Sequence, residues 1–94
     1  MPAYVSASVI VKDPNKLKTY LEGLPATLQP FGGKPVARGK VSQVLHGSND
    51  AHIQAVFEFA DAAAANAWYQ SDAYQALIPN RDEAIEGSIV ILES

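Results

Sequence analysis

The 94-residue sequence predicts an α+β fold, in which a four-stranded antiparallel sheet carries its helices on one face. Three observations lead to this prediction. Four stretches rich in β-branched or alternating residues indicate strands. Two segments repeat apolar residues at helical spacing, and strands and helices follow one another in the order βαββαβ. That order is typical of the split-βαβ or ferredoxin-like plan.

The first strand is expected at residues 4–11 (YVSASVIV), which are β-branched and alternate. A helix follows, because Asp13 is a good N-cap and Pro14 sits where its missing N–H costs nothing. Gly23 and Pro25 interrupt this helix, so we expect either a kink or a break into two short helices. The apolar stripe of the helix consists of Leu17, Tyr20, Leu21, Leu24 and Leu28.

The middle of the chain predicts an antiparallel hairpin. The glycines of residues 30–33 (PFGG) end the helix, and residues 34–47 form the second expected strand, with a bulge at Gly39. A polar GSND turn then leads into residues 52–59 (HIQAVFEF), the most regular alternating strand of the sequence.

The C-terminal third predicts more helix and a final strand. Asp61 caps an alanine-rich helix. A second helical segment restarts at Ser71, bends at Pro79 and ends at Gly87. Residues 88–93 (SIVILE) form the last expected strand.

Composition limits the possible function classes. Hydrophobic residues make up 48% of the chain and charged residues 18%, as in globular proteins. The net charge of −3 and the absence of a Lys/Arg cluster argue against binding to nucleic acid or to anionic membranes. The lack of cysteine excludes disulfides and thiolate metal sites. We therefore expect a single cytoplasmic domain at residues 1–94, with no cofactor and no metal.

Strand alternation predicts two different sheet faces. The face toward the helices is apolar and comprises Val5, Ala7, Val9, Val11, Ile53, Ala55, Phe57 and Phe59. The other face mixes polar groups with the apolar residues Tyr4, Ile10, Val36, Val44, Val56, Val90 and Leu92. An apolar surface of this extent marks an interface, and a second copy of the chain is the simplest partner. We expect a homodimer through this open face, with a ligand cavity between the sheets lined by Ser6, Ser8, Gln54, Glu58 and Arg38.

Several segments resemble the domain of unknown function 1330 family, and the likeness covers almost the whole chain. They are FGGKPVARG, VFEFADAAAANAWYQSDAYQALIPNRDEA, IVILE and the helix start DPNKLKTYLEGLPATLQPFGG. The most specific motif comprises Trp68, Tyr69, Ser71, Tyr74 and Gln75. The resemblance implies the dimeric α+β barrel superfamily, which also contains small cofactorless monooxygenases, lactone isomerases and haem-using enzymes. The family itself carries no established activity.

The aromatic segment allows two interpretations. Trp68, Tyr69 and Tyr74 are either core residues, with their polar atoms hydrogen-bonded, or the wall of a ligand pocket. Arg81 either anchors a ligand carboxylate or pairs with Glu83, Asp82 or a backbone carbonyl.

Arg38 and Glu58 are the candidate catalytic residues. Arg38 lies beside the expected bulge and suits a small carboxylate, although a salt bridge with Glu58 is the alternative. Glu58 serves as a base only if burial raises its pKa. His46 and His52 flank one polar turn and lack an evident third ligand, so solvated turn histidines are favoured over a metal site.

Two function hypotheses remain open at this point. In the first, the protein binds or converts a small organic acid or aromatic compound without a cofactor. In the second, it is a non-catalytic dimeric module that binds a metabolite or a partner protein.

Overall fold

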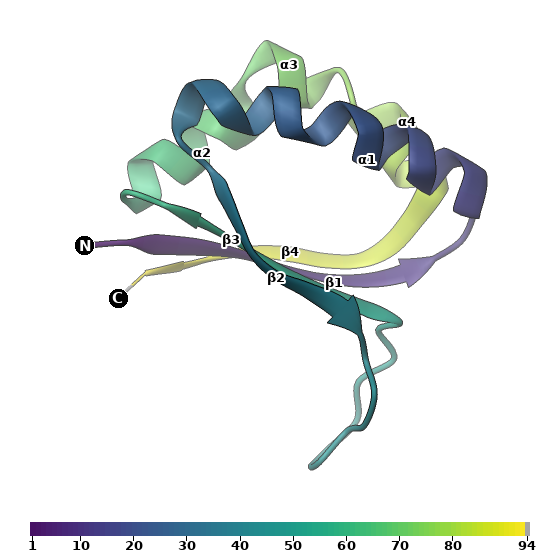
Figure 1. The fold of residues 1–94 in the computed structure, drawn as a ribbon. Helices are drawn as coiled ribbons and strands as arrows, with labels where there is room; N and C mark the ends of the chain where they lie inside the picture. Colours follow the sequence, from purple (N-terminus) through teal and green to yellow (C-terminus); the bar gives the residue numbers. More distant parts are fainter. Residues whose placement is uncertain (94) are drawn as a thin grey trace.

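A computed structural model describes residues 1–93; Ser94, the last residue of the expected domain, lies outside the described residues. One antiparallel sheet has the strand order β2-β3-β1-β4 and one helical layer covers one of its faces (Figure 1). The strands are β1 (Ala3–Val11), β2 (Lys34–Lys40), β3 (Ile53–Phe59) and β4 (Ile85–Glu93). The helices are α1 (Pro14–Leu28), the short 3₁₀ helix η1 (Gln29–Phe31), α2 (Ala62–Gln70), α3 (Asp72–Gln75) and α4 (Ile78–Ala84). The α+β prediction and its element order are confirmed.

The three predicted helix caps are present. The side chains of Asp13, Asp61 and Ser71 each accept a hydrogen bond from a backbone N–H in the first turn that follows. These bonds satisfy amides that have no partner inside the helix, which explains why helices begin at these points. Gly32 adopts a φ of 69° directly after η1, so a glycine ends this helical segment as expected.

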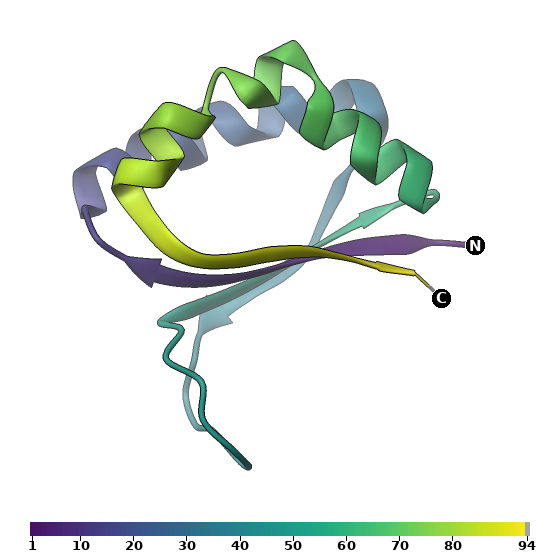
Figure 2. The same ribbon diagram turned by 180° about the vertical axis from the view of Figure 1, so that it is seen from behind.

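Of the two alternatives expected at Pro25, the break does not occur, because α1 runs past this residue. Two other predicted boundaries are wrong. Strand β2 ends at Lys40, so residues 41–47 belong to a long loop rather than to the strand. Gly87 does not end a helix, because β4 already begins at Ile85. Figure 2 shows the loop of residues 41–52 leaving the sheet on the side away from the helices.

The position of the bulge also differs from the prediction. The register between β2 and β3 shifts between Pro35 and Ala37, so Val36 is the extra residue and Gly39 pairs normally with Gln54. Directly opposed residues of an antiparallel pair share one face of the sheet. Arg38 pairs with Ala55 and therefore faces the helices, whereas simple alternation had placed it on the open face.

The main core lies under α2. Val5, Phe59, Trp68 and Tyr74 are almost completely buried there, with Tyr74 at 0% and Trp68 at 2% exposure. The indole Nε1 of Trp68 donates to Thr27 Oγ1 at 3.0 Å, so the one polar atom of this side chain has a partner. Helix α2, which carries Trp68, lies at the end of the helical layer nearest both chain termini (Figure 1).

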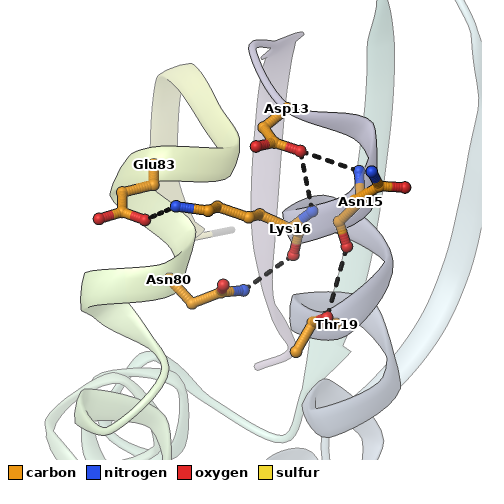
Figure 3. A network of polar contacts seen from close by, with 6 residues as sticks. All are labelled: Asp13, Asn15, Lys16, Thr19, Asn80 and Glu83. Carbon is orange, nitrogen blue, oxygen red and sulfur yellow. Dashed lines mark hydrogen bonds and ion pairs between the residues drawn. The ribbon is translucent and has the colours of Figure 1, made fainter.

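A polar network ties α1 to α4 at the opposite end (Figure 3). The Lys16 amine forms an ion pair with Glu83, and Asn80 Nδ2 donates to the Lys16 carbonyl at 2.8 Å. The hydrogen bond to Glu83 raises the pKa of Lys16 above its ordinary value of 10.5. Lys16 near the start of α1 and Thr27 near its end are thus both hydrogen-bonded to other helices, which fixes the position of α1 over the sheet. Within residues 1–93 no helix is long and apolar enough to cross a membrane.

Gly87 is the position at which the backbone most clearly requires glycine. Its φ is +132°, and a Cβ built there would lie 2.0 Å from the Ser8 carbonyl oxygen on β1. We expect Gly87→Ala to lower the free energy of unfolding by about 3 kcal/mol, because the β1–β4 pairing must open to admit the methyl group. Urea denaturation measures this change.

The matched control is Gly39→Ala. No heavy atom lies within 4 Å of a Cβ at this position. Replacing glycine by alanine lowers the conformational entropy of the unfolded chain to the same extent in both variants, so this effect does not distinguish them. Because the added methyl group meets no atom at position 39, the free energy of unfolding of the control should stay within about 0.5 kcal/mol of the wild-type value. Equal stability of the two variants would contradict the close approach of β1 and β4.

Candidate ligand-binding site

Small side chains leave an unfilled space between α1 and the sheet. Ala7 and Ala55 are paired neighbours on β1 and β3 and face the helices. Two residues further along the same strands, Val5 and the larger Phe57 oppose each other. Because alanine reaches only a short way from the sheet, α1 does not close down on it. A pocket of about 860 Å³ remains.

The pocket is mainly apolar. Leu17, Leu21, Leu24 and Leu28 of α1 form its roof. Its floor comes from the sheet and comprises Ala7, Val9, Ile53, Ala55, Phe57, Ile85 and Ile89. The volume lies in the range of about 300–1,000 Å³ that is usual for small-molecule sites, and an apolar lining with few polar groups is typical of them.

Cationic side chains form one rim of the pocket. Lys34, Arg38 and Lys40 of the edge strand β2 all border it, and of these Arg38 and Lys40, opposite Ala55 and Ile53, face the helices. Arg38 also lines a shallower groove that adjoins Lys18 and Glu22 of α1. Within residues 1–93, the Arg38 guanidinium makes no side-chain hydrogen bond or ion pair. In a chain of net charge −3, this concentration of positive charge favours an anionic group at the rim.

The bulge separates Arg38 from the other expected site residues. Glu58 pairs with Tyr4 and Lys34 on the open face, so the alternative Arg38–Glu58 salt bridge does not form in the described chain. Ser6 also lies on the open face, and Ser8 donates to Gln54 Oε1 at 3.0 Å there. The structure therefore brings Ser6, Ser8, Gln54 and Glu58 together on one face, and places Arg38 on the other.

The aromatic residues gather beside the pocket and not around it. Trp68 and Tyr74 lie in the core, as the first of the two interpretations has it. The Tyr20 and Tyr74 hydroxyls are 2.9 Å apart. Arg81 Nη1 donates to the Tyr69 hydroxyl at 3.0 Å and to that of Tyr74 at 3.2 Å.

Arg81 also pairs with Asp82 at 3.1 Å, one of the structural alternatives that the sequence left open. Burial opposes the charge of Arg81, but its bonds to Tyr69, Tyr74 and Asp82 outweigh this effect and raise its pKa. Burial, and next the neighbouring Tyr74, raises the pKa of Tyr20. Tyr20 is the one member of the cluster that also lines the pocket.

The pocket walls are suited to binding rather than to proton transfer. Among the described residues, the lining includes no carboxylate, histidine, cysteine, serine or threonine. Tyr20 supplies the only hydroxyl group, and its raised pKa disfavours the phenolate that a base would require. His46 and His52 are exposed at the far loop, where His52 Nδ1 accepts from the Val11 N–H at 3.2 Å.

The open face exposes the apolar residues that alternation predicted. Val36, Val90 and Leu92 are 57%, 46% and 50% exposed. Tyr4, Ile10 and Val56 are half-buried between them, and Val44 and Leu45 are exposed on the loop.

The pocket itself was not anticipated from the sequence. The signal was present in Ala7 and Ala55, two small residues within the helix-facing set. Their significance depends on knowing that they are neighbours in register, which the sequence alone does not state.

A family model described as a domain of unknown function (DUF1330) matches residues 2–94. This match confirms the resemblance that the sequence motifs indicated. No curated protein matches the sequence.

Solved structures share the fold at low sequence identity. A protein of unknown function from Rhodopseudomonas palustris is 20% identical with a TM-score of 0.80, and the match covers 99% of this chain and 82% of that one. A dimeric ferredoxin-like protein of unknown function from Jannaschia sp. CCS1 is 16% identical with a TM-score of 0.73 over 100% of both chains. A dabb family protein with a ferredoxin-like fold from Mesorhizobium loti is 16% identical, with a TM-score of 0.68 over 99% of this chain and 94% of that one. These matches confirm the ferredoxin-like fold.

The buried Tyr20 hydroxyl predicts a specific loss of stability in alkali. Because folding raises the pKa of Tyr20 above its ordinary value of 10.0, the contribution of this residue is complete below that pH and declines above it, where only the unfolded chain ionises. One pH unit above that value, wild type should have lost about 1.4 kcal/mol more than Tyr20→Phe. Urea denaturation across this range measures the difference.

Tyr4→Phe is the control, since Tyr4 lies on the open face, away from the cluster. This variant should keep the alkaline decline of the wild type. The same decline in Tyr20→Phe would show that the hydroxyl is not held in its neutral form.

Proposed function

The chain belongs to the DUF1330 family, a domain of unknown function, and from this premise we propose that it is a homodimer that binds a small organic acid in each subunit. The acid has an apolar or aromatic body, which lies between α1 and the sheet. Its carboxylate lies at the rim beside Arg38. No cofactor takes part.

The observation that carries the proposal is the pairing of an apolar pocket with an unpartnered cation at its rim. An apolar body gains about 25 cal/mol for each Å² removed from water. A guanidinium binds a carboxylate with two parallel hydrogen bonds, which fixes the orientation of the ligand. A neutral apolar compound gains only the first contribution, and a small hydrophilic acid gains only the second.

Binding without catalysis is the form of the proposal that the geometry supports best. Conversion of the acid would require a base or a nucleophile at the ligand, and the described lining contains no carboxylate, histidine, cysteine, serine or threonine; its amines, on Lys34 and Lys40, lie at the rim. Glu58, the expected candidate base, lies on the opposite face of the sheet. The second function hypothesis, a dimeric metabolite-binding module, is thereby favoured.

The proposed interface of the homodimer is the open face of the sheet. Val36, Val90 and Leu92 are apolar side chains that water covers in a single chain. Burying several hundred Å² of such surface contributes several kcal/mol at about 25 cal/mol per Å², from which association costs must be subtracted. Dimeric ferredoxin-like proteins of unknown function from Jannaschia sp. CCS1 and Thermobifida fusca have the same fold, which supports the same assembly here.

Arg38→Gln tests the anchor. Isothermal titration with benzoate, phenylacetate and hexanoate, and with their amides, should show that the variant loses affinity for the acids by about tenfold or more. Affinity for the amides should remain, because the apolar walls are intact. Lys12→Gln removes the same charge outside the pocket and should bind as the wild type does. An unchanged preference for acids in Arg38→Gln would remove Arg38 from the site.

Ala55→Leu tests the pocket. The added side chain projects from the floor into the space below α1, so ligand affinity should fall by about tenfold or more while stability is kept or rises by about 1 kcal/mol. Ala26→Leu places the same side chain on the exposed surface of α1 and should leave binding intact. Wild-type affinity in a folded Ala55→Leu variant would show that ligands bind elsewhere.

A further inference from the structure

Two cations of strand β2 occupy successive positions on the helix-facing side of the sheet. Arg38 is opposite Ala55. Lys40 is opposite Ile53, and both of these partners belong to the floor of the pocket. Only Gly39, which has no side chain, stands between the two cations. Residues two apart on a strand are separated by about 6.7 Å. The edge of the pocket therefore presents two positive charges side by side.

The bulge at Val36 is the reason that both cations face the helices. Lys34 precedes the bulge and is opposite Glu58, on the open face. After the extra residue the alternation continues in the other phase, so Arg38 and Lys40 both turn toward the pocket. The insertion of one residue thus moves two charges to the pocket side.

Neither of these charges has a counterion within the chain. Among residues 1–93, the side chains of Arg38 and Lys40 form no ion pair and no side-chain hydrogen bond. The pocket lining described there contains no carboxylate. The groove outside Arg38 adjoins one charge of each sign, Lys18 and Glu22, and so adds no net charge. Because like charges at this separation repel each other, anionic groups bound at the rim would relieve an unfavourable interaction.

A single anionic group does not match two separated cations. A carboxylate that accepts two parallel hydrogen bonds from the Arg38 guanidinium has both oxygens engaged there. Lys40 then stays unpaired at the edge of an apolar space. One phosphate group contacts both cations only if their head groups converge, which brings two like charges together. Two carboxylates a few atoms apart instead neutralise each cation at its own position.

We propose that the ligand of the pocket is a dicarboxylic acid with an apolar or aromatic body, held by one carboxylate at Arg38 and by the other at Lys40. This inference rests on the proposed function, which places one carboxylate at Arg38, and adds Lys40 as the residue that distinguishes diacids from monoacids. The planar guanidinium fixes the orientation of the first carboxylate. The lysine amine, a compact charge on a flexible stem, reaches the second.

Two probes that differ by one carboxylate test the proposal. Adding a carboxylate to 4-phenylbutanoate, on the carbon that bears the benzyl group, gives benzylsuccinate with the same phenyl body. Isothermal titration at about pH 7.5, where all these carboxyl groups are ionised, should show that the wild type binds benzylsuccinate about fivefold or more tightly. In about 1 M NaCl, where the Debye length is about 3 Å, this preference should narrow. Equal affinity for the two probes would overturn the proposal.

Lys40→Gln tests the second anchor. Lys40 is exposed, so the variant should fold. It should lose the preference for benzylsuccinate and bind 4-phenylbutanoate within about twofold of the wild type, because only the diacid uses this charge. Arg38→Gln should weaken the binding of both acids. Lys12→Gln removes the same charge outside the pocket and should keep the preference. A preference that survives in Lys40→Gln would remove this residue from the site.

A phosphate probe tests whether two separate anionic groups are required. 2-Phenylethyl phosphate carries a similar body and places close to two negative charges on one group at about pH 7.5. We expect it to bind more weakly than benzylsuccinate. Tighter binding of the phosphate would assign the two cations to a single dianionic group and overturn the dicarboxylate.

The monoacid separates failure of this inference from failure of the proposed function. If 4-phenylbutanoate binds in a manner that depends on Arg38 but benzylsuccinate binds no better, the dicarboxylate is wrong and the acid-binding pocket stands. If neither acid binds to the wild type, both proposals are wrong.

Discussion

A side chain of β1 or β3 can point only toward the helices or away from them, and this constraint underlies both candidate surfaces of the protein. Toward the helices, Val5 and Phe59 fill the space under α2, while Ala7 and Ala55 leave a gap under α1. Away from the helices, Tyr4 and Val56 remain only half-covered. The distribution of side-chain size on one face produces the pocket. The distribution of polarity on the other produces the candidate interface.

Val36 is the residue at which this alternation is interrupted, and the charge pattern of the pocket depends on it. Because the bulge adds one residue to β2, Arg38 pairs with Ala55 and faces α1 rather than the open side. Without the extra residue, the guanidinium would lie on the open face, on the side of Glu58 and away from the pocket. The bulge thus keeps a cation free beside an apolar space, which is the arrangement that an amphiphilic acid requires.

Local rules of sequence were sufficient for much of the fold and insufficient for the site. Asp13, Asp61 and Ser71 cap helices because their side chains satisfy amides only two or three residues away. The end of the exposed edge strand β2 was harder to predict from the sequence, since no burial pattern distinguishes this strand from the loop after Lys40. The pocket depends on Ala7 and Ala55 being neighbours, and the role of Gly87 depends on the Ser8 backbone, so both follow from long-range pairing.

The two proposed roles of the protein meet on β2, and this couples them. In a single chain this strand is exposed along its whole length and pairs only with β3. A ligand at Arg38 contacts its helix-facing side, and a second copy of the chain on the open face would cover the opposite side. By linkage, an acid that binds more tightly to the dimer also strengthens dimerisation by the same factor.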